Sequence, residues 1–469
     1  MFVSITMAIR AASPARRIAS GRVSRRFRRC LLAAPLLCWS VAAAADDAAA
    51  PPDDTAPQQW AIHAQSTLVW AYQPQFRSGY QGAHSLPAAA NGRETFDLTL
   101  FGGVRLWRGA EFWVNPEVDQ GFGLGNTFGT AGYLSGEAYK LGAVYPYGRV
   151  ARAFVRQTIN VGGETEKLEA EANQLRGSQT ANRVVVTIGK FPLTDLFDTN
   201  QYAHDPRGDF LNWAILDVGS FDYAADAWGA TYGVAVEWYQ GRWTARVGAF
   251  DLSNMPNSAF LNVPLLQQNQ YVAELEERHT LGDQPGKLKA FYWISFGNLG
   301  TYNAALVQGA ATGQTPSTAN VRHWQSKYGV GLNLEQQVVP NLGVFARAGW
   351  SQGSVEEDDF TDINESASVG VSLAGTGWGR PDDTVGLAGV VNQISHAAKE
   401  YFAAGGLGGI IGDGRLSEAG PEQILETYYK YALFSFANVS ADYQFVNNPA
   451  YNRQRGPVSV ISLRLHAEF

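Results

Sequence analysis

Apolar and polar residues alternate one by one along many segments of this chain. In the last segment, "VSVISLRLHAEF", Leu463, Leu465 and Phe469 share one parity, whereas Ser462 and Arg464 share the other. Successive side chains of a β-strand point to opposite faces, so this pattern predicts a strand with one apolar and one polar face. The same alternation occurs in "ETFDLTL", in "WGATYGVAVEWYQGRWTARVGAF" and in "KYGVGLNLEQQ".

The two faces of these predicted strands differ in a way that is typical of a membrane barrel. One face carries charged residues and glycine, and the other carries aliphatic residues bounded by aromatic rings. Lipid outside, water inside and an aromatic girdle at each interface produce this distribution. An open sheet edge cannot face hydrocarbon, so the sheet must close. The pattern therefore predicts an all-β fold, a closed antiparallel transmembrane β-barrel.

The number and spacing of the segments predict about sixteen strands, with an uncertainty of two. Connections after even-numbered strands are mostly short and those after odd-numbered strands are mostly long, as expected if both termini face the periplasm. The segment "GGETEKLEAEANQLRGSQTA" is an exception, because it is a long connection after an even strand. The strands are expected to start near Trp60, Arg93, Ala110, Arg152, Asn182, Ala227, Arg242, Gln270, Gly286, Trp324, Leu342, Ser366, Asp383, Ile424, Ala437 and Pro457.

The first 45 residues have a different character from the rest of the chain. Arginines recur in residues 16–29, a short apolar run follows over residues 30–41, and the sequence "AAAA" comes next. A basic region, a short apolar core and small residues predict a secretory signal peptide over residues 1–45, cleaved after Ala44 or Ala45. Residues 46–59 then form a flexible lead, and the transmembrane barrel domain is expected over residues 60–469.

Removal of residues 1–45 changes the chemistry that is available. Cys30 and Cys38 leave with this segment, so no disulfide or thiolate is expected in the mature chain. Eight of the 36 basic residues also leave, so 28 remain against 43 acidic residues and the net charge is about −15. Nucleic-acid binding is therefore not expected. The mean hydropathy of −0.17 is too polar for a helical membrane bundle.

No catalytic or metal-binding motif is recognised in the sequence. Glu117 and Asp119 could suggest a glycosidase pair, but they lie two apart on one predicted strand and have no second carboxylate placed opposite them. The seven histidines show no metal-ligand spacing. We therefore expect no enzyme activity, no cofactor and no metal.

Several long blocks of the sequence resemble the carbohydrate-selective porin family, the porin B group of Gram-negative bacteria. They include "RETFDLTLFGGVRLWRGAEFWVNPEVDQGFGLGNT", "GKFPLTDLFDTNQYAHDPRGDFLNW" and "DYQFVNNPAYNRQRGPVSVISLRLHAEF". The resemblance runs from about Trp60 to Phe469. It implies a sixteen-stranded barrel in the outer membrane that admits small neutral sugars, especially monosaccharides such as glucose. A terminal phenylalanine on the last strand, Phe469, likewise resembles the signal that directs such proteins to the outer-membrane barrel assembly machinery.

A sixteen-stranded barrel leaves an aqueous channel, so selectivity requires a segment folded inside it. The third long loop, residues 192–226, is rich in Asp, Asn, Arg and aromatic residues, and we expect it to bend inward and form the constriction. Sugars need hydrogen-bonding groups and an aromatic face. The candidates in the loop are Asp198, Asn200, His204, Asp205, Arg207, Asp209, Asn212 and Trp213, and those on the wall are Asp97, Glu111, Glu117 and Asp119 opposite Arg105, Arg152, Arg156, Arg246 and Arg347.

Alternatives remain at this point. Many of these residues could form salt bridges that hold the loop down, or be hydrated lumen residues. A general or weakly ion-selective diffusion porin would show the same strands, although lysine clusters typical of anion pores are not evident. The barrel would contact lipid and lipopolysaccharide, and both a monomer and a homotrimer are compatible with the sequence.

Overall fold

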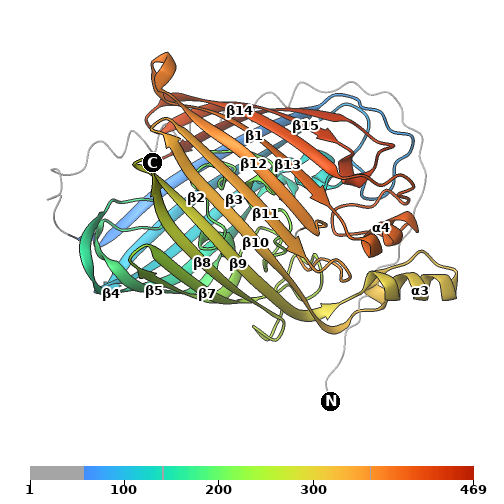
Figure 1. Ribbon diagram of the computed structural model, residues 1–469, viewed down its shortest axis with the longest axis horizontal. Coiled ribbons are helices and arrows are strands. Elements are labelled where there is room, and N and C mark those ends of the chain that lie inside the picture. The colour runs from blue at the N-terminus through green and yellow to red at the C-terminus, as the bar shows by residue number, and fades with distance from the viewer. Residues whose placement is uncertain (1–56, 140–141, 360) are drawn as a thin grey trace. The chain divides into compact units, whose positions relative to one another are not determined.

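The computed structural model describes residues 57–139, 142–359 and 361–469. Within them, sixteen antiparallel strands follow one another around a closed barrel, and β1 pairs with β16 to complete it (Figure 1). The fold prediction is therefore confirmed. The predicted signal peptide and residues 46–56 of the predicted lead lie outside the described residues.

The strands vary from nine to 26 residues, and short helices occur only in connections of the described chain. The strands are β1 (Trp60–Gln73), β2 (Asn91–Trp107), β3 (Ala110–Gly121), β4 (Ala143–Leu168), β5 (Gly177–Phe191), β6 (Thr231–Gln240), β7 (Trp243–Asp251), β8 (Asn269–Leu281), β9 (Gln284–Leu299), β10 (His323–Val339), β11 (Leu342–Ser351), β12 (Glu365–Gly375), β13 (Arg380–Gln393), β14 (Glu422–Phe434), β15 (Ala437–Asn447) and β16 (Val458–Glu468). The α-helices are α2 (Trp213–Leu216), α3 (Tyr302–Thr312) and α4 (His396–Ala403), and the 3₁₀ turns are η2 (Leu124–Thr127), η3 (Leu193–Asp195), η4 (Thr318–Asn320), η5 (Thr376–Trp378) and η6 (Pro449–Tyr451). No helix in this part of the chain is both long and apolar enough to cross a membrane.

The alternation of the sequence corresponds to the two faces of the barrel wall. On β16, Ile461 and Leu463 are each 50 % exposed on the outer face, whereas Arg464 is buried on the inner face. On β10, Leu332 is exposed and Lys327 is buried. Lipid on one side and enclosed polar groups on the other explain why the period of two is so regular.

Large rings on the inner face of the wall lie over glycines of the neighbouring strand. A Cβ atom on Gly331 of β10 would come within 2.2 Å of the Phe291 ring of β9, and one on Gly329 would come within 2.7 Å of the Trp293 ring. Phe291 and Trp293 are almost fully buried. Glycine at these positions therefore lets the rings lie flat against the wall and fill the space between the wall and the loop inside.

The end of the chain takes part in closing the barrel. The Phe469 N–H donates to the Ala64 carbonyl at 2.8 Å, and the Ala64 N–H donates to the Phe469 carbonyl at 3.1 Å. The Phe469 ring stacks on Phe436, with 5.0 Å between the ring centroids. The terminal ring thus lies at the two-residue turn between β14 and β15.

The predicted alternation of short and long connections is present. Five connections after even-numbered strands have two residues, and that between β12 and β13 has four. Long connections follow the odd-numbered strands, and the longest covers residues 192–230 between β5 and β6. One end of the barrel therefore carries short turns, and the other carries long loops together with α3 and α4 (Figure 1).

Three strands differ from the prediction: β4, β6, and β5, which starts at Gly177 rather than near Asn182. β4 starts at Ala143 rather than near Arg152, and it continues to Leu168, through the first seven residues of the segment expected to be a loop. That segment pairs with β5, as in Leu168 with Gly177, so the connection covers only residues 169–176. β6 starts at Thr231, because residues 227–230 belong to the preceding loop.

Candidate functional site

The long connection between β5 and β6 folds into the barrel, as its sequence predicts. Its residues Phe210 and Phe221 are almost fully buried. Phe210 contacts Tyr428 of the wall edge to face at a centroid distance of 5.0 Å, and Phe221 contacts Phe291 at 4.7 Å. Aromatic contacts of this kind hold an irregular segment against the inner face of the wall.

Asp198 attaches the start of this loop to the wall. Its carboxylate accepts hydrogen bonds from Asn333 Nδ2 at 2.6 Å, from Arg347 Nε at 3.2 Å and from the Val218 N–H at 2.6 Å. Arg347 also donates to the carbonyl of Ala203 at 2.8 Å. Asp198 and Arg347 are buried, so this pair shapes the loop and does not face the channel.

Three further candidates of the loop also form hydrogen bonds within the fold. Asn200 donates to Asn333 Oδ1 at 2.7 Å. Asn212 caps α2 by accepting from the Ala214 N–H at 3.1 Å, and it donates to Gln444 Oε1 at 3.0 Å. Asp209 accepts from the N–H groups of His204 and Asp205, at 3.2 and 3.3 Å, and burial raises the pKa of Asp209 with a contribution from the nearby Asp205 charge.

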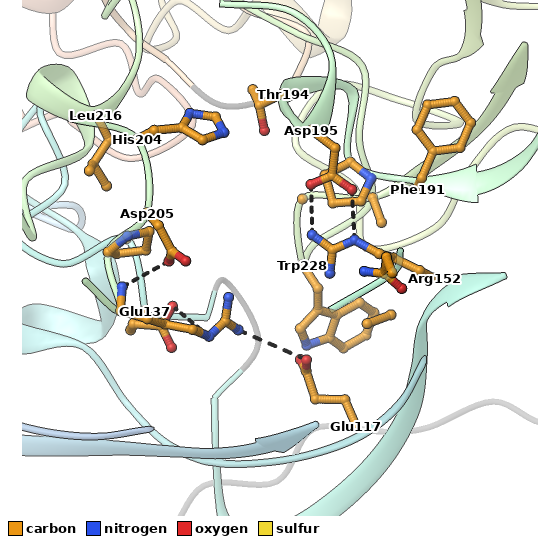
Figure 2. A pocket seen from close by; sticks show the side chains of 18 of the residues that line it. Glu117, Glu137, Arg152, Phe191, Thr194, Asp195, His204, Asp205, Leu216 and Trp228 are labelled. Atoms are coloured by element: carbon orange, nitrogen blue, oxygen red, sulfur yellow. Dashed lines mark hydrogen bonds and ion pairs between the residues drawn. The ribbon is translucent and has the colours of Figure 1, made fainter. Parts of the chain in front are cut away.

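A cavity of about 460 Å³ lies between this loop and the wall. Figure 2 shows His204, Asp205 and Glu137 on one side of it, and Asp195, Arg152 and Trp228 on the other. Seven of the sequence candidates line the cavity: Glu117, Arg152, Arg156, His204, Asp205, Arg207 and Trp213.

Arg207 is the loop cation that faces two carboxylates of the wall and one of the β3–β4 connection. Its guanidinium nitrogens lie 3.8 Å from Asp97 Oδ1, 3.9 Å from Glu117 Oε2 and 3.7 Å from Glu137 Oε1. Burial works against the charge on Arg207, but these carboxylates outweigh it and raise its pKa well above the ordinary value. Burial likewise opposes the ionisation of Asp205, but the Arg207 charge and N–H overcome it and lower the pKa of Asp205.

In two places in the cavity, a basic side chain and a carboxylate face each other beyond hydrogen-bonding distance. Their atoms therefore remain able to form hydrogen bonds. Arg207 Nε makes no hydrogen bond within the described residues, although a carboxylate oxygen lies 3.7 Å away. His204 Nδ1 and Asp217 Oδ1 lie 3.9 Å apart, and neither has a hydrogen-bond partner within those residues. Burial and the Arg347 charge lower the pKa of His204, whereas burial and the Asp198 charge raise the pKa of Asp217 well above its ordinary value.

Three arginines of β4 line the cavity, Arg152 and Arg156 by strand parity and Arg149 because the strand contains a bulge. The register with β3 shifts between Arg152, opposite Asn115, and Val150, opposite Pro116. Proline lacks the N–H that a regular ladder requires, and a bulge changes the parity of the strand. Arg149 and Arg152 therefore both line the cavity, although strict alternation would place them on opposite faces.

These arginines are firmly paired. Arg149 Nε donates to Asp119 Oδ2 at 2.6 Å, and its Nη2 is bonded to Glu117. Arg152 binds both oxygens of Asp195, each at 2.7 Å. A bidentate arginine–carboxylate pair is among the stronger ion pairs, so Arg152 and Asp195 present a fixed polar surface to the cavity.

The remaining wall candidates form ion pairs but do not themselves line the cavity. Glu111, near the β2–β3 turn, is 3.2 Å from Arg156 Nη2 and 3.6 Å from Arg105 Nη2. Arg246 is held by three carboxylates, those of Glu237, Glu274 and Glu276, at 2.9, 2.7 and 3.0 Å. Asp97, Arg105, Glu111, Asp119, Asp198, Asn200, Asp209, Asn212, Arg246 and Arg347 do not line the cavity.

Aromatic rings form part of the cavity lining. Trp213 lies between Tyr133 and Tyr223, at centroid distances of 5.5 and 5.4 Å. Across the cavity, Trp228 donates from Nε1 to the Tyr147 hydroxyl at 3.0 Å. Trp213 is buried among these rings, whereas the half-buried Trp228 offers an apolar surface beside charged groups, the combination expected for sugar binding.

Several lining residues were not identified from the sequence: Tyr133, Glu137, Arg149, Asp195, Asp217, Tyr223 and Trp228. Asp195 and Asp217 lie in the predicted loop and could have been included by residue type. Glu137 and Tyr133 come from the separate β3–β4 connection, and no local pattern indicates that this connection meets the β5–β6 loop.

The lining is nearly balanced in charge. Four arginines and six acidic residues surround the cavity, which gives a nominal charge of −2 before the raised pKa of Asp217 is considered.

Among the residues that the structure describes, no three or more His, Cys, Asp or Glu side chains are grouped to hold a metal ion.

Comparison with known proteins agrees with this architecture. OprB of Pseudomonas putida, 16 % identical, superposes with a TM-score of 0.65 over 88 % of this chain and 94 % of that one. The channel DcaP of Acinetobacter baumannii gives a TM-score of 0.48 at 11 % identity, over 87 % of this chain and 97 % of that one. At 16 % identity the likeness to OprB concerns the fold alone.

The sequence itself provides the family assignment. A search of curated proteins returns no significant match. Residues 83–469, most of the barrel, match the family described as carbohydrate-selective porin, OprB family. The chain therefore belongs to the OprB family of carbohydrate-selective porins.

Proposed function

We propose that this protein is a passive channel for small neutral sugars, with monosaccharides such as glucose as its preferred solutes. Membership of the porin family implies an outer-membrane channel, and family and fold together indicate a channel rather than an enzyme. The preference for sugars rests on the residues of the cavity. Its volume of about 460 Å³ lies in the range of about 300–1,000 Å³ that is usual for small-molecule sites.

The observation that carries this proposal is the loosely paired polar set on the loop. Arg207 Nε, His204 Nδ1 and Asp217 Oδ1 are enclosed but make no hydrogen bond within the described residues. A buried polar group without a partner costs free energy, which a solute hydroxyl can recover by bonding to it. The half-buried Trp228 ring of the same lining offers a surface for the C–H face of a sugar ring.

The near balance of charge favours neutral solutes over ions. Because Arg149 and Arg152 are each bonded directly to carboxylates, their charges are largely compensated. A pore that concentrates anions requires uncompensated basic groups. The transverse arrangement of paired charges instead provides many hydrogen-bonding groups with a modest net potential.

Liposome swelling tests the proposal. The purified, refolded protein would be compared for uptake of glucose, a disaccharide, a neutral amino acid of similar size and a charged solute. Faster entry of glucose than of the size-matched amino acid would support a sugar-selective pathway. Rates that follow molecular size alone would refute the selectivity and indicate a general diffusion porin.

The proposal includes how the chain reaches the membrane. Residues 1–45 would be removed on export, and Phe469 would contribute to recognition by the barrel assembly machinery, in contact with lipid and lipopolysaccharide. Its exposed outer-face position at the end of the closing strand supports this role. Deletion of Phe469 would then lower the yield of folded barrel in cells, whereas unchanged assembly would refute the role.

A further inference from the structure

The β4–β5 hairpin extends beyond its neighbours at the short-turn end of the barrel. β3 pairs with β4 only as far as Gln157, and β6 pairs with β5 only as far as Arg183. Beyond these residues β4 and β5 pair only with each other. Residues 158–182 therefore form a two-stranded ribbon past the turns of the adjacent strands, at the periplasmic end expected for short turns.

The base of this ribbon contains an irregularity that bends it. The β4–β5 register shifts on both sides of Gly162, and Gly162 and Gly163 have φ values of 151° and 88°. Glycine adopts such positive φ values without steric penalty, and bulges bend a strand. Because an isolated two-stranded ribbon is marginally stable, the position of its tip depends on contacts with the barrel.

The tip, residues 169–176, is attached to the mouth of the barrel. The Arg176 carbonyl accepts from the Gln58 N–H at 3.0 Å, and the Arg176 N–H donates to Gln58 Oε1 at 2.9 Å. Leu175 is fully buried, and its N–H lies 3.4 Å from Glu111 Oε2. Arg156 donates to the carbonyl of Asn173. The tip thus turns back towards the inner face instead of projecting freely.

The same tip forms part of the cavity. Glu171, Ala172, Asn173 and Gln174 line it together with residues of the β5–β6 loop. A solute in the cavity can therefore contact the carboxamides of Asn173 and Gln174 in the tip as well as residues of the β5–β6 loop. The loop and the tip come from different ends of the barrel, since one is a long connection and the other a short one.

We propose that the tip of the β4–β5 hairpin, residues 169–176, forms a second narrowing of the solute pathway at its periplasmic end. This inference rests on the proposed function in one respect, because it takes the cavity to be the conducting pathway. The Gly162–Gly163 bulge positions the tip, and the contacts of Leu175 and Arg176 hold it there. Asn173 and Gln174 then present polar groups to a solute as it leaves.

Shortening the hairpin tests the inference. Replacing residues 161–182 by Asn-Gly joins the paired residues Asn160 and Arg183 by a turn that suits a two-residue hairpin. The matched control replaces residues 376–379, the β12–β13 turn, by the same dipeptide, because that turn does not line the cavity. We expect the first variant to raise single-channel KCl conductance about twofold or more, and the control to leave it unchanged.

A point substitution tests the same inference without shortening the chain. Leu175→Asp would place a carboxylate beside Glu111 and release the tip, whereas Ala170→Asp adds the same charge at an exposed position of the tip. Release of the tip should raise the conductance of Leu175→Asp, whereas Ala170→Asp should conduct like the wild type. Unchanged conductance in a folded Leu175→Asp barrel, or equal effects of both substitutions, would overturn the inference. Failure of this inference can be distinguished from failure of the proposed function, because conductance is measured with ions. A wild-type protein that shows no preference for sugars would refute the proposed function, whatever the conductance of the variants.

Discussion

Removing the charge of Arg207 is expected to make the channel more selective for cations. The substitution Arg207→Gln keeps a hydrogen-bonding side chain but leaves Asp97, Glu117 and Glu137 without the guanidinium that now lies 3.7–3.9 Å from each. The firmly bonded pair of Arg149 with Glu117 remains. The net effect on the cavity is the loss of one positive charge.

The size of the effect follows from Coulomb's law. A unit charge about 6 Å from a permeating ion in a water-like dielectric contributes about 0.7 kcal/mol, or about threefold in local ion concentration. Loss of the positive charge raises the local concentration of cations by this factor and lowers that of anions by the same factor. The ratio of potassium to chloride permeability should therefore rise by about tenfold. A lower dielectric in the enclosed cavity would increase the change, and added salt would reduce it.

The permeability ratio is obtained from the reversal potential of the purified protein in a planar bilayer under a KCl gradient. Arg242→Gln is the matched control, because the Arg242 side chain is 65 % exposed at a short turn and lies outside the cavity lining. A ratio within about twofold of the wild type for Arg207→Gln, or a shift towards chloride, would refute the place of Arg207 in the pathway.

Three further substitutions test the packing and the buried charges of the barrel interior. Asp198→Ala leaves the buried Arg347 without its carboxylate, so the denaturation midpoint should fall by the equivalent of about 3–5 kcal/mol and conductance should rise as the loop loosens. Gly331→Ala places a Cβ 2.2 Å from the Phe291 ring and should cost about 1–3 kcal/mol in the same unfolding assay. Asp358 is a buried carboxyl in the outer connection 352–364, and burial together with the charges of nearby acids raises its pKa. A raised pKa in the folded state means that the folded protein keeps this proton to a higher pH than the unfolded chain does, so the stability should fall as pH rises. Asp358→Asn should weaken this pH dependence of the thermal midpoint.

Matched variants separate these effects from general damage. A Cβ on Gly377 meets no atom within 4 Å, so Gly377→Ala should leave the unfolding midpoint unchanged. Asp382→Asn alters an exposed aspartate and should retain the wild-type pH dependence. If Asp198→Ala unfolds at the wild-type midpoint, or if Asp358→Asn keeps the full slope with pH, the corresponding buried carboxylate does not act as described.

The strands were predictable because the membrane imposes the pattern that identifies them. Lipid selects apolar residues on one face, so β10 and β16 could be recognised from a period of two alone. Residues 162–181, which form most of the hairpin, read as a loop because that constraint ends where the membrane ends. There the strands still pair, but their exposed faces carry charged residues and glycine, so pairing leaves no apolar signal.

The candidate site was less predictable, because its members meet through loop packing. Parity correctly places Arg152 and Arg156 inside, but the bulge opposite Pro116 also turns Arg149 inward, and alternation cannot show this. Asp195 reaches Arg152 only once the β5–β6 loop has folded inside. Residue types in the loop therefore indicated the chemistry, whereas the partners depended on contacts between segments far apart in the sequence.

Distance and exposure together separate the anchoring charges of the interior from those that face the pathway. Arg347 and Asp198 are about 1 % and 0 % exposed and bonded at 3.2 Å, so a solute can neither reach them nor compete for them. The Arg207 side chain is 19 % exposed, and its carboxylates lie at 3.7–3.9 Å, beyond normal hydrogen-bonding distance. A sugar hydroxyl can thus bind Arg207 without first breaking a hydrogen bond to a wall carboxylate. For this reason substitutions of Arg207 should change permeation more than stability, and those of Asp198 should change stability first.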